Sequence, residues 1–180
     1  MFEACKSGET KIVQLLLERC NSEENKLNFK DRYGITPFMW ACRKGHADVV
    51  KLLLDHSNSI IELNERSNGL NERSRFLLTP LWPIYEKKSF GVTAFMFACE
   101  NGHKDVVQLL LEYSGRIELN ARTNGGWTAL MWACYNGQKY VVKLLLDHSD
   151  IDLNITDNAG RTALMIASQR RYQDIVQILQ

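Results

Sequence analysis

The sequence predicts an all-α solenoid of stacked helix-turn-helix units joined by short hairpin loops. One phrase is repeated along the chain, as YGITPFMWACRKGHADVVKLLLDHS from Tyr33, FGVTAFMFACENGHKDVVQLLLEYS from Phe90, GGWTALMWACYNGQKYVVKLLLDHS from Gly125 and AGRTALMIASQRRYQDIVQILQ from Ala159. Its glycine recurs at Gly91, Gly126 and Gly160, at intervals of 35 and 34 residues. Such a period is typical of proteins in which each unit packs only on its neighbours.

Each unit is predicted to contain two helices. The fourth residue of the phrase is an N-cap threonine, which recurs as Thr36, Thr93, Thr128 and Thr162. Pro37 suits the first helical position, where a missing N–H has no cost. This helix ends at Gly45, Gly102 or Gly137. The pattern VVKLLL then predicts a second helix with one broad apolar face.

The last unit departs from the phrase at the end of its first helix. Arg171 stands where other units have glycine, so this helix end must be strained or reshaped. No later unit follows in this chain to cover the second helix. We therefore expect an apolar stripe, formed by Ile175, Val176, Ile178 and Leu179, that either stays exposed or is covered by a second copy of the chain.

The chain resembles the ankyrin-repeat family. Its run TPFMWA, followed by GHADVVKLLL and ELN, matches the family phrase T-P-L-H-x-A, G-H, V-V-x-L-L-L and V-N except at the histidine. The resemblance implies one domain over residues 1–180. Its repeats are expected at about 1–30, 31–66, 67–122 with an insert at 70–90, 123–156 and 157–180, the first and last being incomplete.

Two further columns of residues are predicted to fill the core. The family histidine is replaced by methionine, at Met39, Met96, Met131 and Met165. A second column consists of Cys5, Cys42, Cys99 and Cys134. Packed helices lie roughly 8–10 Å apart, beyond the reach of a disulfide or shared metal ligands, so we interpret these thiols as small core residues. We expect His46 and His103, which begin second helices, to hydrogen-bond locally.

Composition and motifs favour a binding protein over an enzyme. The formal net charge is +1, and the five cysteines are an odd number without paired spacing, which favours a reducing compartment. We expect a soluble monomer in the cytoplasm or nucleus, with no membrane span. The sequence has no phosphate-binding glycine loop, nucleophile elbow or H-E-x-x-H motif. It therefore predicts no enzymatic activity, cofactor, metal or small-molecule substrate.

The resemblance also implies a partner-binding surface, at the hairpin tips and the ends of the first helices on the concave side. The corresponding residues are Arg32, Tyr33, Ile35, Arg43, Lys44, Arg66, Phe90, Val92, Glu100, Asn101, Arg122, Trp127, Tyr135, Asn136, Arg161 and Arg170. Basic and aromatic residues predominate, and Tyr, Trp and Arg dominate protein-interface hot spots. We expect a protein-protein interaction scaffold that binds an acidic peptide or protein surface.

Two alternatives use the same features. The basic surface would also suit nucleic acid or anionic lipid, whose binding falls steeply with salt. The chain begins within a repeat and ends in a helix, so it would also suit a structural spacer in a larger protein.

The insert at 70–90 interrupts the third hairpin and is not an intact repeat, because Pro83 would break a helix there. Its apolar residues include Phe76, Leu77, Leu81, Trp82 and Tyr85, which are poorly suited to water. We expect them either to pack on neighbouring hairpins or to form an exposed finger that binds a partner.

Overall fold

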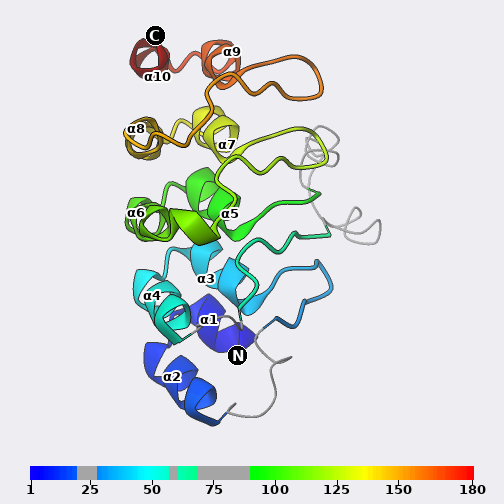
Figure 1. Ribbon diagram of the computed structural model, residues 1–180, viewed down its shortest axis with the longest axis vertical. Coiled ribbons are helices and arrows are strands. Elements are labelled where there is room, and N and C mark those ends of the chain that lie inside the picture. The colour runs from blue at the N-terminus through cyan, green and yellow to red at the C-terminus, as the bar shows by residue number, and fades with distance from the viewer. Residues whose placement is uncertain (20–27, 57–60, 69–89) are drawn as a thin grey trace.

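The computed structural model describes residues 1–19, 28–56, 61–68 and 90–180, which form five stacked pairs of α-helices (Figure 1). The pairs are α1 (Phe2–Ser7) with α2 (Thr10–Arg19), α3 (Pro37–Lys44) with α4 (Ala47–His56), α5 (Ala94–Asn101) with α6 (Lys104–Glu112), α7 (Ala129–Tyr135) with α8 (Lys139–Leu146), and α9 (Ala163–Gln169) with α10 (Gln173–Leu179). A 3-10 helix, η4 (Ser114–Arg116), follows α6. The first helices form one row, the second helices another, and the hairpin loops project from the first row (Figure 1). The predicted all-α stack is confirmed.

The first helices begin as the threonine pattern predicts. Thr36 Oγ1 accepts a hydrogen bond from the backbone N–H of Met39 at 3.2 Å. Thr93, Thr128 and Thr162 make the equivalent bond at 3.3 Å, each to the methionine three residues later. Because each cap satisfies an N–H that the helix cannot, the same cap sets the start of α3, α5, α7 and α9.

The histidines that begin second helices join neighbouring pairs. His103 Nε2 donates to the carbonyl oxygen of Arg43 at 2.9 Å, and His46 Nε2 donates to that of Lys6 at 3.0 Å. Gly45 adopts φ 79°, and a Cβ there would lie 2.5 Å from the His103 ring. The expectation of local bonding is therefore wrong, because these rings pack under the helix end of the preceding pair.

The carboxyl-terminal pair combines a strained helix end with a covered apolar face. Arg171 has φ 62° and is the one non-glycine residue of the described ranges with positive φ, as its position predicts. Ile175 is fully buried, while Val176, Ile178 and Leu179 are partly buried against the core. The expected exposed stripe is therefore wrong, because the last pair packs this face on itself and on its neighbour.

The methionine column is core in the inner pairs and exposed in the last. Met39, Met96 and Met131 are buried, whereas Met165 is 51% exposed. The prediction of core filling is confirmed for the first three and wrong for Met165, since no following pair covers it. Cys5, Cys42, Cys99 and Cys134 are buried free thiols, as predicted.

The third hairpin is closed by bonds that span the insert. Ser67 N–H donates to Val92 O at 3.0 Å, and Gly91 N–H donates to Ser67 O at 2.9 Å. The fourth hairpin is closed in the same way between Thr123, Gly126 and Trp127. Residues 69–89, including the predicted apolar insert residues Phe76, Leu77, Leu81, Trp82 and Tyr85, lie outside the described ranges.

Candidate functional site

Most of the predicted contact residues are accessible at the hairpins and the ends of the first helices. Those with exposed side chains are Arg32, Lys44, Arg66, Asn101, Arg122 and Arg170. Those partly buried are Tyr33, Arg43, Phe90, Glu100, Tyr135, Asn136 and Arg161. We define the first-helix surface as the side chains at the carboxyl ends of α1, α3, α5, α7 and α9.

Three of the predicted contact residues are core residues. Ile35, Val92 and Trp127 are each at least 95% buried. Each follows the glycine that ends a hairpin turn, and the chain directs its side chain under the hairpin at that point. These three side chains lie in the core beneath the surface and are not part of it. Their inclusion in the predicted set of partner-contact residues is therefore wrong.

An amino-terminal cluster surrounds Trp40 on α3. The Lys6 ammonium lies 5.3 Å from the Trp40 ring centroid, and the Arg43 guanidinium lies 5.2 Å from it. Arg43 also lies 5.2 Å from the centroid of Phe97 on α5. At these distances the ring faces attract the cations and hold them in place. The sequence-based set omitted Trp40 and Phe97, although an aromatic residue follows the methionine in three of the repeated phrases.

A carboxyl-terminal cluster forms where α7 meets the last pair. The Arg170 guanidinium lies 4.4 Å from the Tyr135 ring centroid, and its Nε donates to the Tyr135 carbonyl oxygen at 3.1 Å. Tyr135 packs edge-on to Trp127, with centroids 5.3 Å apart. Arg161 lies 5.8 Å from the Trp127 centroid. The cluster is therefore a buried tryptophan with cations and a tyrosine above it.

Arg161 is already neutralised within the fold. Its Nε donates to Asp157 Oδ2 at 2.9 Å, and the two side chains form an ion pair. Burial alone would raise the pKa of Asp157, but hydrogen bonds from Arg161 and from the Ala159 N–H lower the pKa below its ordinary value. The carboxylate is therefore ionised at neutral pH, so Arg161 offers little charge to a partner.

Acidic and neutral residues separate the two clusters. Burial raises the pKa of Glu100, at the end of α5, and the positive charge of the nearby Arg43 opposes this rise. Asn101 Nδ2 donates to Phe97 O at 2.8 Å, and Asn136 Nδ2 donates to Trp132 O at 3.0 Å. The ends of α5 and α7 therefore contribute a carboxylate and two amides, and the cation over Tyr135 at the end of α7 is Arg170 from the last pair.

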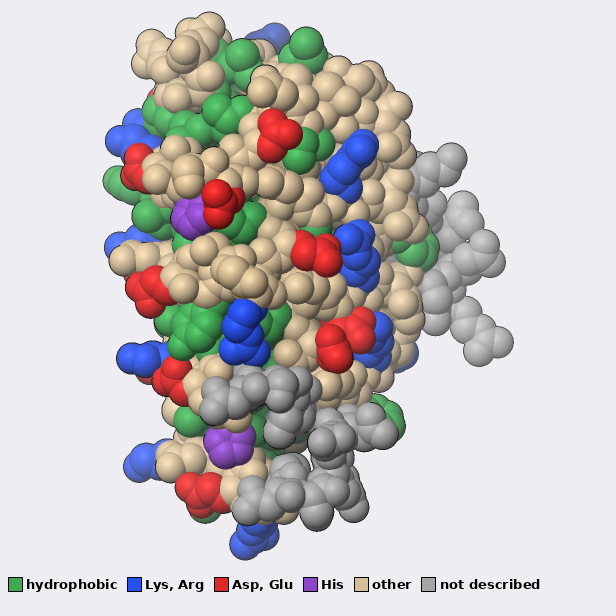
Figure 2. Space-filling model, viewed as in Figure 1, with side chains coloured by type: hydrophobic (Ala, Val, Ile, Leu, Met, Phe, Trp, Pro, Cys, Tyr) green, Lys and Arg blue, Asp and Glu red, His purple; other side chains and the backbone are tan. Residues whose placement is uncertain are grey.

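Arg66 and Arg122 link one hairpin to the next. Arg66 Nη1 donates to the Arg122 carbonyl oxygen at 2.7 Å, and Arg122 Nη2 donates to Thr156 O at 3.0 Å. Arg66 also pairs with Glu118 at 3.2 Å. On the face drawn in Figure 2, acidic and basic side chains are likewise interspersed. Two of the arginines that were predicted to contact a partner, Arg66 and Arg122, therefore bond neighbouring hairpins of the array.

The cysteine column is poorly suited to nucleophilic or metal chemistry. Burial raises the pKa of Cys5 to about 11 and that of Cys134 to about 12, and it raises the pKa values of Cys42 and Cys99 still further. The thiolate is the reactive and metal-binding form, so these thiols are inert at neutral pH. Within the described ranges no group of three or more His, Cys, Asp or Glu residues is placed to hold a metal ion.

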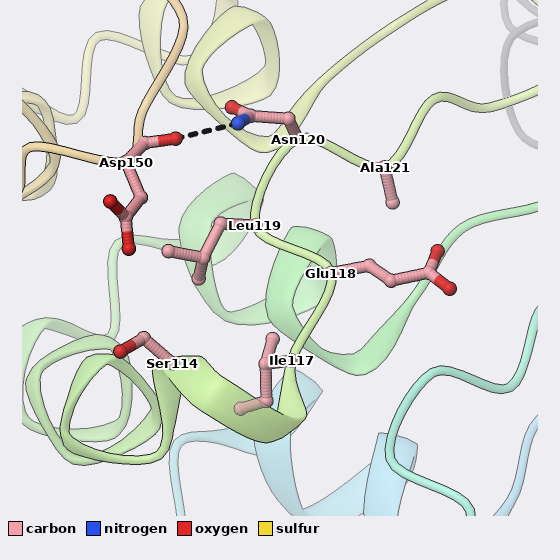
Figure 3. Close-up of a pocket in the computed structure, with 7 residues that line it drawn as sticks. All are labelled: Ser114, Ile117, Glu118, Leu119, Asn120, Ala121 and Asp150. Atoms are coloured by element: carbon pink, nitrogen blue, oxygen red, sulfur yellow. Dashed lines mark hydrogen bonds between the residues drawn. The ribbon is translucent and has the colours of Figure 1, made fainter.

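A hollow of about 430 Å³ lies beside the loop that follows η4 (Figure 3). Ile117 and Leu119 line it, and Asn120 Nδ2 donates to the Asp150 carbonyl oxygen across its upper edge at 2.6 Å. Glu118 points away from the Asp150 side chain (Figure 3). The two lining carboxylates are thus not directed at a common point, which gives no basis for paired acid-base chemistry.

Comparison with known families gives a match over the whole chain. The family model described as ankyrin repeats (3 copies) matches residues 1–67, 66–157 and 117–180. No curated protein matches the chain. None of the helices in the described ranges has the length and apolar character needed to cross a membrane.

Proposed function

The chain belongs to the ankyrin-repeat family, and from this premise we propose that its first-helix surface binds an acidic segment of another protein. Ankyrin repeats are generally protein-protein interaction modules and are typically non-enzymatic. The family therefore supplies the general role. The chemistry of the partner is inferred from this chain's own side chains.

The observation that carries the proposal is the layering of cations over aromatic rings. Lys6 and Arg43 lie over Trp40, and Arg170 lies over Tyr135. Because aromatic contact restricts these flexible side chains, less conformational entropy is lost when they bind a carboxylate. No carboxylate in the described part of the chain forms an ion pair with Arg43, Lys44 or Arg170. The charges of Lys44 and Arg170 are therefore available for a partner, whereas that of Arg43 is partly balanced by the nearby Glu100.

The aromatic side chains add a contribution that does not depend on charge. Trp40 and Tyr135 are partly buried, so each retains some accessible ring surface. Tyrosine, tryptophan and arginine are the residues most often found at interface hot spots. An acidic segment with apolar residues would match both properties of the surface.

Charge reversal tests this proposal. The double variant R43E/K44E should bind an acidic peptide panel at least about tenfold more weakly than the wild type, because close charge pairs across an interface are lost and become repulsive. Its melting temperature should fall modestly, with a cooperative transition retained, because Lys44 is an exposed charge while Arg43 loses its contacts with Trp40 and Phe97. Binding is measured by fluorescence anisotropy and stability by circular dichroism.

K51E/K143E is the matched control. It makes the same change in net charge at exposed positions on the second helices α4 and α8. It should bind the panel like the wild type. If both double variants lost affinity equally, net charge alone would explain binding and the proposed surface would be wrong.

A further inference from the structure

We infer that the preferred partner segment is bipartite, with two acidic groups separated by an uncharged spacer of roughly five to six residues. This inference rests on the proposed function and concerns the charge pattern that the partner must have. It follows from the order of side chains along the first-helix surface.

The available cations lie on either side of the end of α5, since Lys6 at the end of α1 already pairs with Glu3. Arg43 and Lys44 lie at the end of α3. At the other end, Arg170 and Arg171 follow α9 directly, and both are exposed. Arg161 is ion-paired within its own hairpin and adds little net charge. The surface therefore has two cationic ends rather than one continuous basic stripe.

The middle of the surface disfavours carboxylates. Glu100 is partly buried at the end of α5, and because burial already raises its pKa, a second carboxylate beside it would either be repelled or require proton uptake, both of which weaken binding. Asn101 and Asn136 each use an amide N–H to bond a carbonyl oxygen in their own helix. Each amide keeps its oxygen as an acceptor and its second N–H as a donor, so it suits the backbone of an extended peptide and adds no charge to attract an acidic side chain.

The position of Glu100 is fixed by the neighbouring pair. Gln138 Nε2 donates to the Glu100 carbonyl oxygen at 3.2 Å, and Gly102 ends the helix in the left-handed conformation with φ 75°. Because the backbone that carries Glu100 is held in this way, its carboxylate is a persistent feature of the surface. It acts as a specificity-determining residue against acidic spacers.

The spacer length follows from the geometry of the stack. Helices α3, α5 and α7 are successive neighbours, and the Arg170 guanidinium lies over Tyr135 at the end of α7, so two helix-to-helix steps separate the end of α3 from this cation. Steps of roughly 8–10 Å give a separation of about 16–20 Å. An extended chain advances about 3.3 Å per residue, which corresponds to roughly five to six residues.

Three synthetic peptides of equal length test the inference against the wild-type protein. The first has two Asp-Asp pairs separated by six Ser and Ala residues, the second has the four Asp residues together, and the third has Asn in place of every Asp. We expect the first to bind about tenfold more tightly than the second, because only the first reaches both cationic ends. If the two acidic peptides bound equally and better than the Asn peptide, the bipartite inference would be overturned while the proposed function survived. If neither exceeded the Asn peptide, the proposed function itself would fail.

A fourth peptide isolates the role of Glu100. It carries the two Asp-Asp pairs and one additional Asp at the centre of the spacer. It should bind the wild type about fivefold more weakly than the first peptide, and in E100Q the ratio of the two affinities should fall close to one, whatever the affinity of E100Q for the first peptide. An equal penalty in both proteins would overturn the assignment of Glu100.

Tighter binding of a single-stranded oligonucleotide of the same charge would overturn the protein partner in favour of nucleic acid.

Discussion

Two tryptophans at the same position of the repeat differ in how their indole N–H is satisfied. Trp40 Nε1 donates to Asp31 Oδ2 at 2.9 Å, and Asp31 lies nine residues before it. Trp132 occupies the same position after Thr123, which has no second oxygen. Trp132 Nε1 is buried and has no hydrogen-bond partner. A buried donor without an acceptor destabilises the fold. At this position of the repeat, the indole N–H is therefore satisfied for Trp40 and unsatisfied for Trp132.

T123D should supply the acceptor that Trp132 lacks. Thr123 Oγ1 accepts from the Trp127 N–H at 3.1 Å, and Asp31 Oδ1 accepts from the equivalent Ile35 N–H at 3.0 Å, so one carboxylate oxygen can keep the existing bond. The other oxygen would then reach the indole, as in the second repeat. We expect a gain of about 1 kcal/mol in the free energy of unfolding, after the cost of burying the carboxylate. Urea denaturation measures it.

T123N is the matched control for this prediction. Asn keeps an acceptor for the Trp127 N–H but directs an NH₂ group at the indole, where a second donor gives no bond. It should therefore not stabilise the protein. Equal stabilisation by Asp and Asn would show that side-chain size, and not the indole bond, is responsible.

At this scale the sequence predicts residue types better than their exposure. The threonine caps depend on local geometry, so the phrase predicts them correctly. Whether the side chain of Trp127 or Ile35 is exposed on its hairpin or buried beneath it depends on the direction of that side chain after the turn. Alignment with the family phrase does not specify this direction. The cationic clusters likewise depend on Trp40 and Phe97, whose rings meet Arg43 only through packing between pairs.

At the scale of elements, the hairpins are interchangeable units closed by the same backbone bonds. The third and fourth turns share the bond from the turn glycine to the first residue, at 2.9 Å for Gly91 to Ser67 and 2.8 Å for Gly126 to Thr123. The insert therefore does not alter how its hairpin is closed. The sequence predicts the location of the insert because the repeat resumes in register after it. It does not predict what the insert contacts, since no other repeat has a counterpart.

Deleting residues 70–90 should leave the array folded. The deletion joins Ser67, Asn68 and Gly69 to Gly91, which gives Ser-Asn-Gly-Gly where the fourth hairpin has Thr-Asn-Gly-Gly at 123–126. Because the closing bonds are the same, helical content and the cooperativity of unfolding should be retained. Circular dichroism and urea denaturation measure both.

A contiguous deletion of equal length serves as the comparison. Removing residues 91–111 takes away α5 and most of α6 and should abolish cooperative unfolding, since the neighbouring pairs lose their contacts. If the deletion of 70–90 had the same effect, the insert would belong to the core.

At the scale of the whole molecule, the two ends of the stack have one neighbour each. Ile12 and Leu15 on α2 are 44% and 57% exposed, whereas Val49, at the position of Ile12 in the next pair, is fully buried. Met165 is the corresponding uncovered residue at the other end. In a one-dimensional stack, stability comes from each pair and its interfaces, so the end pairs have one interface fewer than the inner pairs.

The carboxyl-terminal pair should open before its inner neighbour, because it combines a single interface with the left-handed Arg171. That conformation costs a residue with a Cβ about 1 kcal/mol, and the equivalent position of the fourth pair is Gly137 with φ 72°. Hydrogen exchange in residues 160–180 should therefore be faster than in α7 and α8.

R171G should slow exchange in residues 160–180 by roughly fivefold, the change in population that about 1 kcal/mol produces. R170G changes the adjacent residue, whose φ of −82° is ordinary, and should not slow exchange. Equal protection of the last two pairs, or slowing by both variants, would show that Arg171 does not limit the stability of this end.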